Sequence, residues 1–283
     1  MPVDPTGSVP GGFHTEFVVT RSVRDAARAL SAFHAPLRVD LRPEGGPRRI
    51  AVATQAAWIP AVDPAIAAAT LRTARLCEQL GHTVEEAAPT IDWFPVFEAM
   101  KDLWALGTLD TVRAWADVSA AGCPADIEGL TWDLVNRARR LDSTDVRAAL
   151  STISSATDTF AAFFAEFDML LTPTLPATAP LIGQFSPDMD SESYYRSPVG
   201  LMEPAVAVFN ATGQPAISIP AGLADGLPVG VHIASGFHRE AMLLALAAEL
   251  EAEIQWPRWT PPVHAGRPRA ENAVTSAAEG HHA

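Results

Sequence analysis

The chain has 283 residues, 48% of them hydrophobic, so it can bury a substantial core and has a length at the upper end of what one domain normally holds. Its formal net charge of −13 argues against non-specific binding of nucleic acid, which needs clustered Lys and Arg to displace counterions from phosphates. No apolar run approaches the roughly 20 residues that a membrane helix requires, and the start of the chain has Pro and Gly where a signal peptide would be apolar. We therefore expect a cytosolic protein that binds neither nucleic acid nor membrane, with small neutral molecules or other proteins as its partners.

The cysteines and histidines form no recognisable metal or disulfide pattern. Cys77 and Cys123 have no CxxC spacing, and no two histidines have the HxxxH spacing of a helical zinc site. A reducing compartment is the expected environment, and we expect neither a metal nor another cofactor.

The first part of the chain predicts a helix followed by a β-helix-β unit. Residues 22–25 (Ser-Val-Arg-Asp) form a capping box, and apolar residues at helical spacing follow it. Residues 49–54 are typical of a short buried strand, and Asp63-Pro64 begins a helix that ends near Leu80. A further strand is expected over residues 82–87. Units of this kind indicate a sheet with helices on its faces.

The middle of the chain, residues 93–167, has mainly helical patterns, which we interpret as a helical insertion or cap layer. Residues 168–172 are too short and apolar for a surface helix and are followed by Pro173, so they predict a buried strand that delivers Thr172 and Thr174 to a sheet edge or cleft. Residues 183–200 are typical of a long ordered loop. A binding loop and a solvated excursion without a role explain that stretch equally well.

The last part of the chain predicts strands over residues 216–219 and 229–234 and an amphipathic helix over residues 242–250. The Pro-rich and then Ala- and Glu-rich stretch that follows predicts a mobile tail. These patterns divide the chain into one large α/β domain over residues 1–255 and a tail over residues 256–283.

Several segments of the chain occur in the order in which one enzyme family has them. They are residues 20–27 (Thr-Arg-Ser-Val-Arg-Asp-Ala-Ala), 49–52, 62–64, 80–86, 170–174 (Leu-Leu-Thr-Pro-Thr) and the run 210–230, which opens with Asn-Ala-Thr-Gly-Gln-Pro. Together they resemble the amidase-signature family, including its members that act on cyclic amides and nylon oligomers, and their shared order argues against coincidence. The resemblance implies an α/β fold with a mixed β-sheet covered by helices on both faces, and hydrolysis of a carboxamide C–N bond in a small-molecule substrate.

The catalytic residues of that family are missing from this sequence. Family members use a Ser-cisSer-Lys arrangement, because an unassisted serine is a poor nucleophile and a tetrahedral oxyanion needs preorganised hydrogen-bond donors. In the family these groups precede the segment that resembles residues 20–27, and the present sequence contains no Gly-Gly-Ser-Ser-Gly-Gly element. We therefore assign no catalytic residue and expect this chain to be inactive alone.

Other serines and the single lysine do not replace the missing groups. Ser154 and its neighbour Ser155 lie in a helical pattern without the glycines that an oxyanion site needs. Lys101 lies in another helical pattern and is expected to be a charge on the surface or at a cleft rim. Ser218 and Ser235 lack the Gly-x-Ser-x-Gly context of an exposed nucleophile, so a structural role is expected for both.

Four positions are candidates for substrate binding: Thr172, Thr174, Glu203 and Asn210. In related glutamine-using amidotransferase subunits, an acidic residue shortly before the Asn-x-x-Gly-x-Pro run helps to hold the substrate, and Glu203 is the nearest acidic residue here. An ordinary solvated side chain is the alternative for Glu203. For Thr172, Thr174 and Asn210 the alternative, which we favour, is the fixing of loop backbones at turns.

Aromatic residues recur in the helical layer, at Trp93, Phe94, Phe97, Trp104 and Trp115. They could form the apolar wall of a substrate site, but core packing explains the pattern with fewer assumptions.

Two hypotheses follow for the function of the chain. In the first, it is the C-terminal part of an amidase that is incomplete through a misplaced start, a split gene or a truncation, and the missing serine and lysine segment is expected nearby in frame. In the second, it is a complete, non-catalytic amidase remnant that acts as a binding or partner subunit. If the sheet of the family is shared between two halves, this part alone would expose a strand edge and apolar surface, which predicts a homo-oligomer or a tightly bound partner chain.

Overall fold

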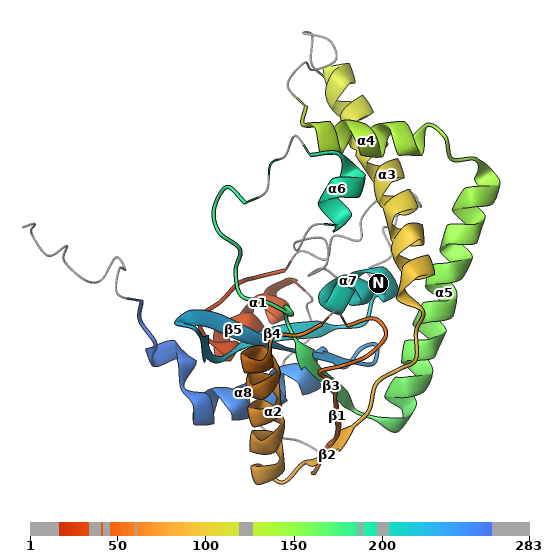
Figure 1. Cartoon of the computed structure of the whole chain (residues 1–283). Helices are drawn as coiled ribbons and strands as arrows, with labels where there is room; N and C mark the ends of the chain where they lie inside the picture. Colours follow the sequence, from red (N-terminus) through yellow and green to blue (C-terminus); the bar gives the residue numbers. More distant parts are fainter. Residues whose placement is uncertain are drawn as a thin grey trace, which may run out of the picture.

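The structure is a computed structural model, and it describes residues 17–33, 41, 46–59, 61–118, 127–184, 186, 189–196 and 204–261. These residues form one five-stranded sheet with helices packed on both faces (Figure 1). The strand order is β2-β1-β3-β5-β4. Three strands are parallel: β2 (Thr83–Glu86), β1 (Arg49–Val52) and β3 (Met169–Pro173). The remaining two are antiparallel: β5 (Leu227–Ser235) to β3, and β4 (Ala216–Ala224) to β5. The expected fold class, α/β with a mixed sheet, is therefore confirmed.

The helices divide between the two faces of the sheet. One face is covered by α1 (Val23–Phe33), α2 (Pro64–Gln79) and α8 (Glu240–Ile254), and the short 3-10 helix η1 (Trp256–Arg258) follows α8. The other face is covered by α3 (Trp93–Val118), α5 (Ser143–Glu166) and α7 (Pro204–Thr212). Two further helices, α4 (Gly129–Ala138) and α6 (Ser191–Arg196), lie beside the outer part of α3 (Figure 1). The helical layer expected from the middle of the sequence is therefore present.

The alternation of side chains along each strand separates two hydrophobic clusters. Successive residues of a strand point to opposite faces of a sheet. Ile50 and Met169 accordingly pack with α1, α2 and α8, whereas Ala51 and Leu170 pack with α3, α5 and α7. Because the central strands β1 and β3 are buried on both faces, their buried residues are apolar apart from Thr172 and do not alternate with polar ones.

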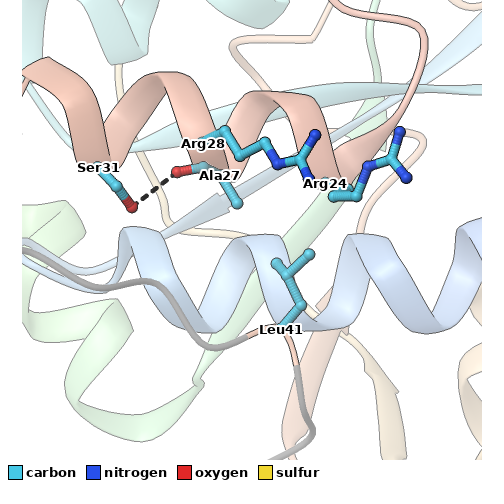
Figure 2. A pocket seen from close by; sticks show the side chains of 5 residues that line it. All are labelled: Arg24, Ala27, Arg28, Ser31 and Leu41. Atoms are coloured by element: carbon cyan, nitrogen blue, oxygen red, sulfur yellow. Dashed lines mark hydrogen bonds between the residues drawn. The ribbon is translucent and has the colours of Figure 1, made fainter.

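The outer side of α1 borders a shallow pocket of about 260 Å³ (Figure 2). Arg24, Ala27, Arg28 and Ser31 from successive turns of α1 line it together with Leu41. The Ser31 hydroxyl donates a hydrogen bond to the Ala27 carbonyl at 2.9 Å, so its polarity is largely used within the helix.

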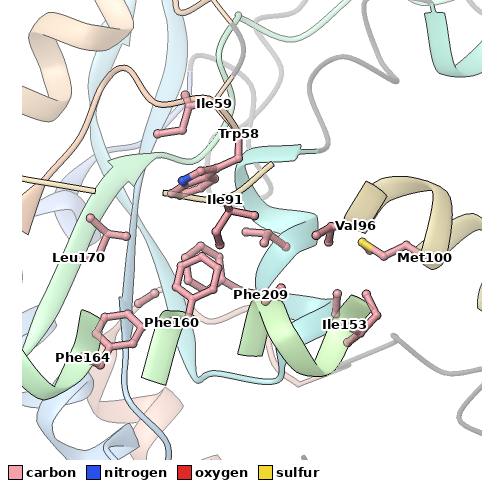
Figure 3. Packing of buried hydrophobic residues seen from close by; sticks show 14 of the residues in the cluster. Trp58, Ile59, Ile91, Val96, Met100, Ile153, Phe160, Phe164, Leu170 and Phe209 are labelled. Atoms are coloured by element: carbon pink, nitrogen blue, oxygen red, sulfur yellow. The ribbon is translucent and has the colours of Figure 1, made fainter. Parts of the chain in front are cut away.

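An aromatic cluster joins the loop after β1 to the helices α5 and α7 (Figure 3). The Trp58 ring meets Phe160 and Phe209 edge-on, with ring centroids 5.8 Å and 6.0 Å away, and Phe160 and Phe209 are 4.9 Å apart. The indole N–H of Trp58 donates to the Pro89 carbonyl at 3.1 Å, which satisfies its one buried polar group. The cluster thereby positions α7 over the sheet.

The predicted helix starts are largely confirmed. The Asp63 carboxylate accepts the Ala65 N–H at 2.7 Å and Pro64 is the first residue of α2, as expected. At α1 only half of the predicted capping box is made: the Asp25 N–H donates to Ser22 Oγ at 3.3 Å, but the Ser22 hydroxyl donates to the Asp25 carboxylate.

Two sequence expectations about loops were wrong. Residues 183–200 contain the helix α6, and the segment before β4 forms α7, so Asn210 lies in a helix rather than at a turn. Val and Phe have modest helix propensity, and tertiary burial of Val208 and Phe209 stabilises α7 in spite of it. The helix ends at Thr212, and the next residue, Gly213, has φ +80° and donates its N–H to the Phe209 carbonyl.

Candidate functional site

A row of polar side chains crosses the sheet beneath α7, where β3 ends. His232 of β5 is the direct register partner of Thr172 in β3 and of Ser218 in β4. Residues directly opposite each other in antiparallel strands point to the same face, so these three side chains point to the side of α3, α5 and α7. Thr174, just after β3, joins them through a 2.7 Å hydrogen bond between its Oγ1 and Ser218 Oγ. We call Thr172, Thr174, Ser218 and His232 the polar row.

A β-bulge in β4 brings Ser218 into the row. Near the hairpin turn at Asp225 and Gly226, Ala224 pairs with Leu227, and an uninterrupted ladder would place Ile233 opposite Ser218. The register shifts by one residue between Pro220 and Gly222, where the strand accommodates an extra residue. Because a shift of one residue exchanges the two faces of a strand, the bulge sets Ser218 instead of Ile219 opposite His232 under α7.

One end of the row is open to solvent. Ser218 is exposed and Thr174 is partly exposed. The Thr174 N–H donates to the Gly230 carbonyl at 3.1 Å, which brings the end of β3 close to β5. A Cβ atom on Gly230 would lie 2.8 Å from Thr174 Oγ1 and 2.9 Å from Ser218 Oγ, so only glycine fits beneath this pair of hydroxyls.

The other end of the row is buried and incompletely hydrogen-bonded. Thr172 is fully buried and His232 is 6% exposed, and neither Thr172 Oγ1 nor His232 Nδ1 has a hydrogen-bond partner among the described residues. The Phe209 ring of α7 lies over the imidazole with its centroid 5.0 Å away. Burial lowers the pKa of His232 from 6.5 to about 4, so the ring is neutral near pH 7. Buried polar groups without partners cost about 1–3 kcal/mol each, so this end of the row calls for a functional explanation or an ordered water.

The four predicted substrate-binding positions are divided by the structure. Thr172 and Thr174 belong to the polar row, at the end of the strand where they were expected. Asn210 is exposed in the last turn of α7. Glu203 lies outside the described residues. From the sequence, Ser218 was expected to be structural and His232 was given no role. The alternation of side chains along the strands would have placed both on the same face as Thr172 only once the bulge was known.

Lys101 lies inside the helical layer rather than on the surface. Its side chain is only 15% exposed and forms an ion pair with Glu98 of the same helix. The ammonium lies 5.1 Å from the Phe97 ring centroid and 5.3 Å from that of Tyr195 in α6, at cation–π distance. Glu98 also accepts from Arg137 of α4 at 2.9 Å. This lysine therefore holds helices together.

The carboxylate of Glu98 is the centre of that ion network. Burial by itself would raise the pKa of Glu98, but hydrogen bonds and charges from Lys101 and Arg137 outweigh burial and lower it. Arg137 in addition donates its Nε–H to Asp102 at 2.7 Å. The network therefore links α3 to α4 through charges that are paired on both sides.

Ser155, Ser235 and Cys77 are not arranged as nucleophiles. Ser155 lies exposed in α5 and donates to the Ser151 carbonyl at 3.0 Å, and Ser235 donates to the Asp168 carbonyl at 2.8 Å. Cys77 is fully buried, and burial raises the pKa of its thiol to about 12, which suppresses the reactive thiolate. Within the described ranges no group of three or more His, Cys, Asp or Glu side chains could hold a metal ion.

The aromatic residues of α3 do not form one continuous wall. Trp93 and Phe97 stack with centroids 5.5 Å apart, and Tyr195 of α6 meets Phe97 edge-on at 5.2 Å. Phe94 is 69% exposed and points elsewhere, and the side chain of Trp115 lies outside the described residues. The stacked rings attach α6 to α3, in keeping with the packing role that the sequence favoured.

The described part of the chain includes no helix that is both long enough and apolar enough to cross a membrane.

The pocket beside α1 lies on the face of the sheet opposite the polar row, because α1 packs with α2 and α8. The polar row is therefore the stronger candidate site.

Comparison with known proteins identifies the family. A match to the family described as Amidase covers residues 2–244, so the chain belongs to that family. It is 35% identical over 264 residues to a putative amidase AmiC of Mycobacterium leprae, and 30% identical over 289 residues to the 6-aminohexanoate-cyclic-dimer hydrolase of Paenarthrobacter ureafaciens. These alignments cover 88% and 90% of the chain but 55% and 56% of the relatives. The chain thus spans about half the length of the curated relatives it matches.

Solved structures agree with this assignment. A 6-aminohexanoate cyclic dimer hydrolase complexed with substrate superimposes with a TM-score of 0.77 at 26% identity, over 86% of this chain and 55% of that one. A bacterial aryl acylamidase of the amidase signature family has a TM-score of 0.68 at 23% identity, which supports the fold alone.

Proposed function

We propose that the chain forms the substrate-facing part of an amidase that hydrolyses a carboxamide C–N bond, and that it does not catalyse this reaction alone. The observation that carries the proposal is the polar row: uncharged hydroxyl and imidazole groups at the end of β3, in a chain of the Amidase family. A preceding segment, in the same or another polypeptide, would supply the nucleophilic serine and its base.

The chemistry of the described residues supports inactivity of the isolated chain. Amide hydrolysis needs an activated nucleophile and donors for the oxyanion. The Ser218 hydroxyl bonds to Thr174, and the ammonium of Lys101 is paired with Glu98. His232 is a weak base because burial opposes its protonation.

The polar row favours a neutral substrate. None of its four side chains is charged near neutral pH, so the buried end at Thr172 and His232 offers no counter-charge to a charged ligand. We infer a small carboxamide as the substrate class. The names of relatives, a cyclic-dimer hydrolase and an acylamidase, are consistent with it. The cytosolic location stays a prediction.

The second candidate function is a non-catalytic binding or partner subunit. The buried atoms Thr172 Oγ1 and His232 Nδ1, which lack partners, would then serve recognition instead of turnover. The two candidate functions make different predictions: adding the missing catalytic segment restores amide hydrolysis if the chain is part of an amidase, and does not if it is a binding subunit.

The test combines the chain with the part of a relative's sequence that lies outside the matched region. The chain alone is expected to hydrolyse no simple carboxamide and to resist serine-directed fluorophosphonate probes, whereas the co-expressed pair is expected to be active. Thr172→Val in the pair should lower kcat/KM, and Thr70→Val, at a buried threonine of α2 that bonds to Ile66, is the matched control. If a fluorophosphonate probe labels the chain alone and this labelling disappears in the Ser218→Ala variant, the proposal is overturned. A stable but inactive pair would favour the binding subunit.

A further inference from the structure

Two buried polar atoms of the polar row belong to residues that face each other directly. Thr172 of β3 and His232 of β5 are register partners, and neither Thr172 Oγ1 nor His232 Nδ1 has a hydrogen-bond partner among the described residues. Directly opposite residues have Cβ atoms about 4.5–5.5 Å apart, so a hydroxyl on one Cβ and a ring nitrogen close to the other are within reach of each other. A rotation about the Thr172 Cα–Cβ bond moves the hydroxyl without displacing either strand.

Other groups do not satisfy these two atoms. The remaining hydroxyls of the row, on Thr174 and Ser218, are bonded to each other at 2.7 Å. The Phe209 ring, whose centroid is 5.0 Å from that of the imidazole, covers His232 with apolar surface. Both atoms are already buried inside this chain, so a further segment packed on its outside would have to displace the chain's own side chains to reach them. Thr172 and His232 are therefore left to pair with each other.

We propose that Thr172 is a positioning residue for His232: its hydroxyl donates a hydrogen bond to Nδ1, which leaves the ring proton on Nε2 and makes Nε2–H a donor for the carbonyl oxygen of the substrate. This inference rests on the proposed function, because it names the atom of the polar row that a carboxamide would meet.

The direction of the bond follows from the protons that each group carries. A neutral imidazole has one N–H and one acceptor nitrogen, whereas a threonine hydroxyl can both donate and accept. If Thr172 donates to Nδ1, one bond satisfies the hydroxyl proton and the ring acceptor together. If Nδ1–H donated to Thr172 instead, the hydroxyl proton would stay buried without an acceptor, which is unfavourable.

The second ring nitrogen of His232, Nε2, is then the one that a ligand can use. It is not one of the buried atoms without a partner, although no described residue forms a hydrogen bond with it, so it keeps access from outside the packed interior. Phe209 lies over the imidazole and is itself packed against Trp58 and Phe160, which restrains the ring. A fixed N–H favours the carbonyl oxygen of an amide over an amine, whose own N–H would find no acceptor here.

An NMR titration of His232 in the isolated chain tests the direction of the bond. A donor to Nδ1 stabilises only the neutral ring, so Thr172→Val should raise the pKa of His232 above its native value of about 4. Thr172→Ser keeps a hydroxyl and should stay closer to the native pKa. Thr70→Val, at a buried threonine that bonds to Ile66, is the control and should leave the pKa of His232 unchanged. A pKa that falls or stays the same in Thr172→Val would overturn the inference.

The 15N spectrum of the His232 ring at pH 7 gives a second measurement that needs no acid. In the native chain Nε2 should carry the proton and Nδ1 should have the shift of a hydrogen-bonded acceptor. In Thr172→Val the Nδ1 resonance should move to the position of an unbonded nitrogen. A native ring that is protonated on Nδ1 would refute the proposed bond.

Kinetics of the co-expressed pair with hexanamide test the donor at Nε2. The Gln side chain carries its amide N–H about as far from the backbone as Nε2 of histidine, and Asn is one carbon shorter. His232→Gln should therefore keep at least about tenfold more kcat/KM than His232→Asn. Equal losses would refute a donor at Nε2. An inactive pair would count against the proposed function and the role of Nε2–H with it, whereas the NMR experiments decide the bond from Thr172 independently.

Discussion

Ser218 and His232 face each other across the β4–β5 ladder only because of the bulge between them and the hairpin turn. Ser218 is exposed and bonded to Thr174, whereas His232 is buried under Phe209. One register pair thus joins the open end of the polar row to its buried end. The predictions below test the parts of this arrangement separately.

Gly230→Ala should destabilise the protein by about 1–3 kcal/mol, because its Cβ would collide with the hydroxyls of Thr174 and Ser218. Urea unfolding measures the effect. Gly236→Ala is the control, since the nearest atom to a Cβ there is 3.4 Å away. In a Ser218→Ala background the cost of Gly230→Ala should shrink, because one of the two clashing atoms is gone. Equal costs for both glycines would show that the close approach at Gly230 is unimportant.

Acid should destabilise the fold through His232. The folded pKa of about 4 lies below the ordinary 6.5, so the unfolded chain binds a proton that the folded chain refuses. The contribution is fully present above about pH 6.5 and is lost as the pH falls toward 4, by at most roughly 3 kcal/mol.

The measurement is the free energy of unfolding as a function of pH for His232→Phe. This variant should be markedly less sensitive to acid over that interval than the native chain. His238→Gln, at an exposed histidine, is the control and should keep the native profile. An unchanged acid dependence in His232→Phe would contradict the assignment.

Arg137→Met should cost about 1–3 kcal/mol, because it leaves the half-buried carboxylates of Glu98 and Asp102 short of a partner. Chemical unfolding again provides the measurement. The control is Arg113→Met, whose pair with Asp110 is exposed on both sides and should contribute under about 1 kcal/mol. Losses of the same size would argue that the inner network adds nothing beyond a surface pair.

Cys77 should react with a thiol reagent only when the protein unfolds. The thiol is fully buried and burial raises its pKa to about 12, so the folded state offers neither access nor thiolate. In a Cys123→Ser background, the rate of labelling at increasing urea should follow the unfolded fraction. Rapid labelling in buffer alone would disprove the burial of this side chain.

The sequence predicted those parts of the fold whose signals are local. Asp63 and Pro64 define the start of α2 by capping chemistry alone, and the apolar run before Pro173 defines β3. The helix α7 was missed because its stability comes from packing of Phe209 against distant rings, which no short window of sequence reveals.

The candidate site was predicted only in part for a similar reason. Thr172 and Thr174 follow from their place at the end of a strand, since strand ends deliver side chains to a sheet edge. Ser218 could not be assigned to the same face as His232, because its facing depends on the bulge between Pro220 and Gly222, which shifts the register of the hairpin by one residue.

The bulge also divides the hairpin into two lengths with different supports. Below it, Ile219 and Val231 belong to the large cluster shared with α1 and α8, whereas beyond it Ala224 and Val229 pack on Ile66 and Ala69 of α2. The outer length is thus an arm fastened to a single helix. Backbone amides in that arm should exchange with solvent independently of those in the part of the hairpin below the bulge. The arm can therefore open locally while the polar row beneath α7 keeps its arrangement.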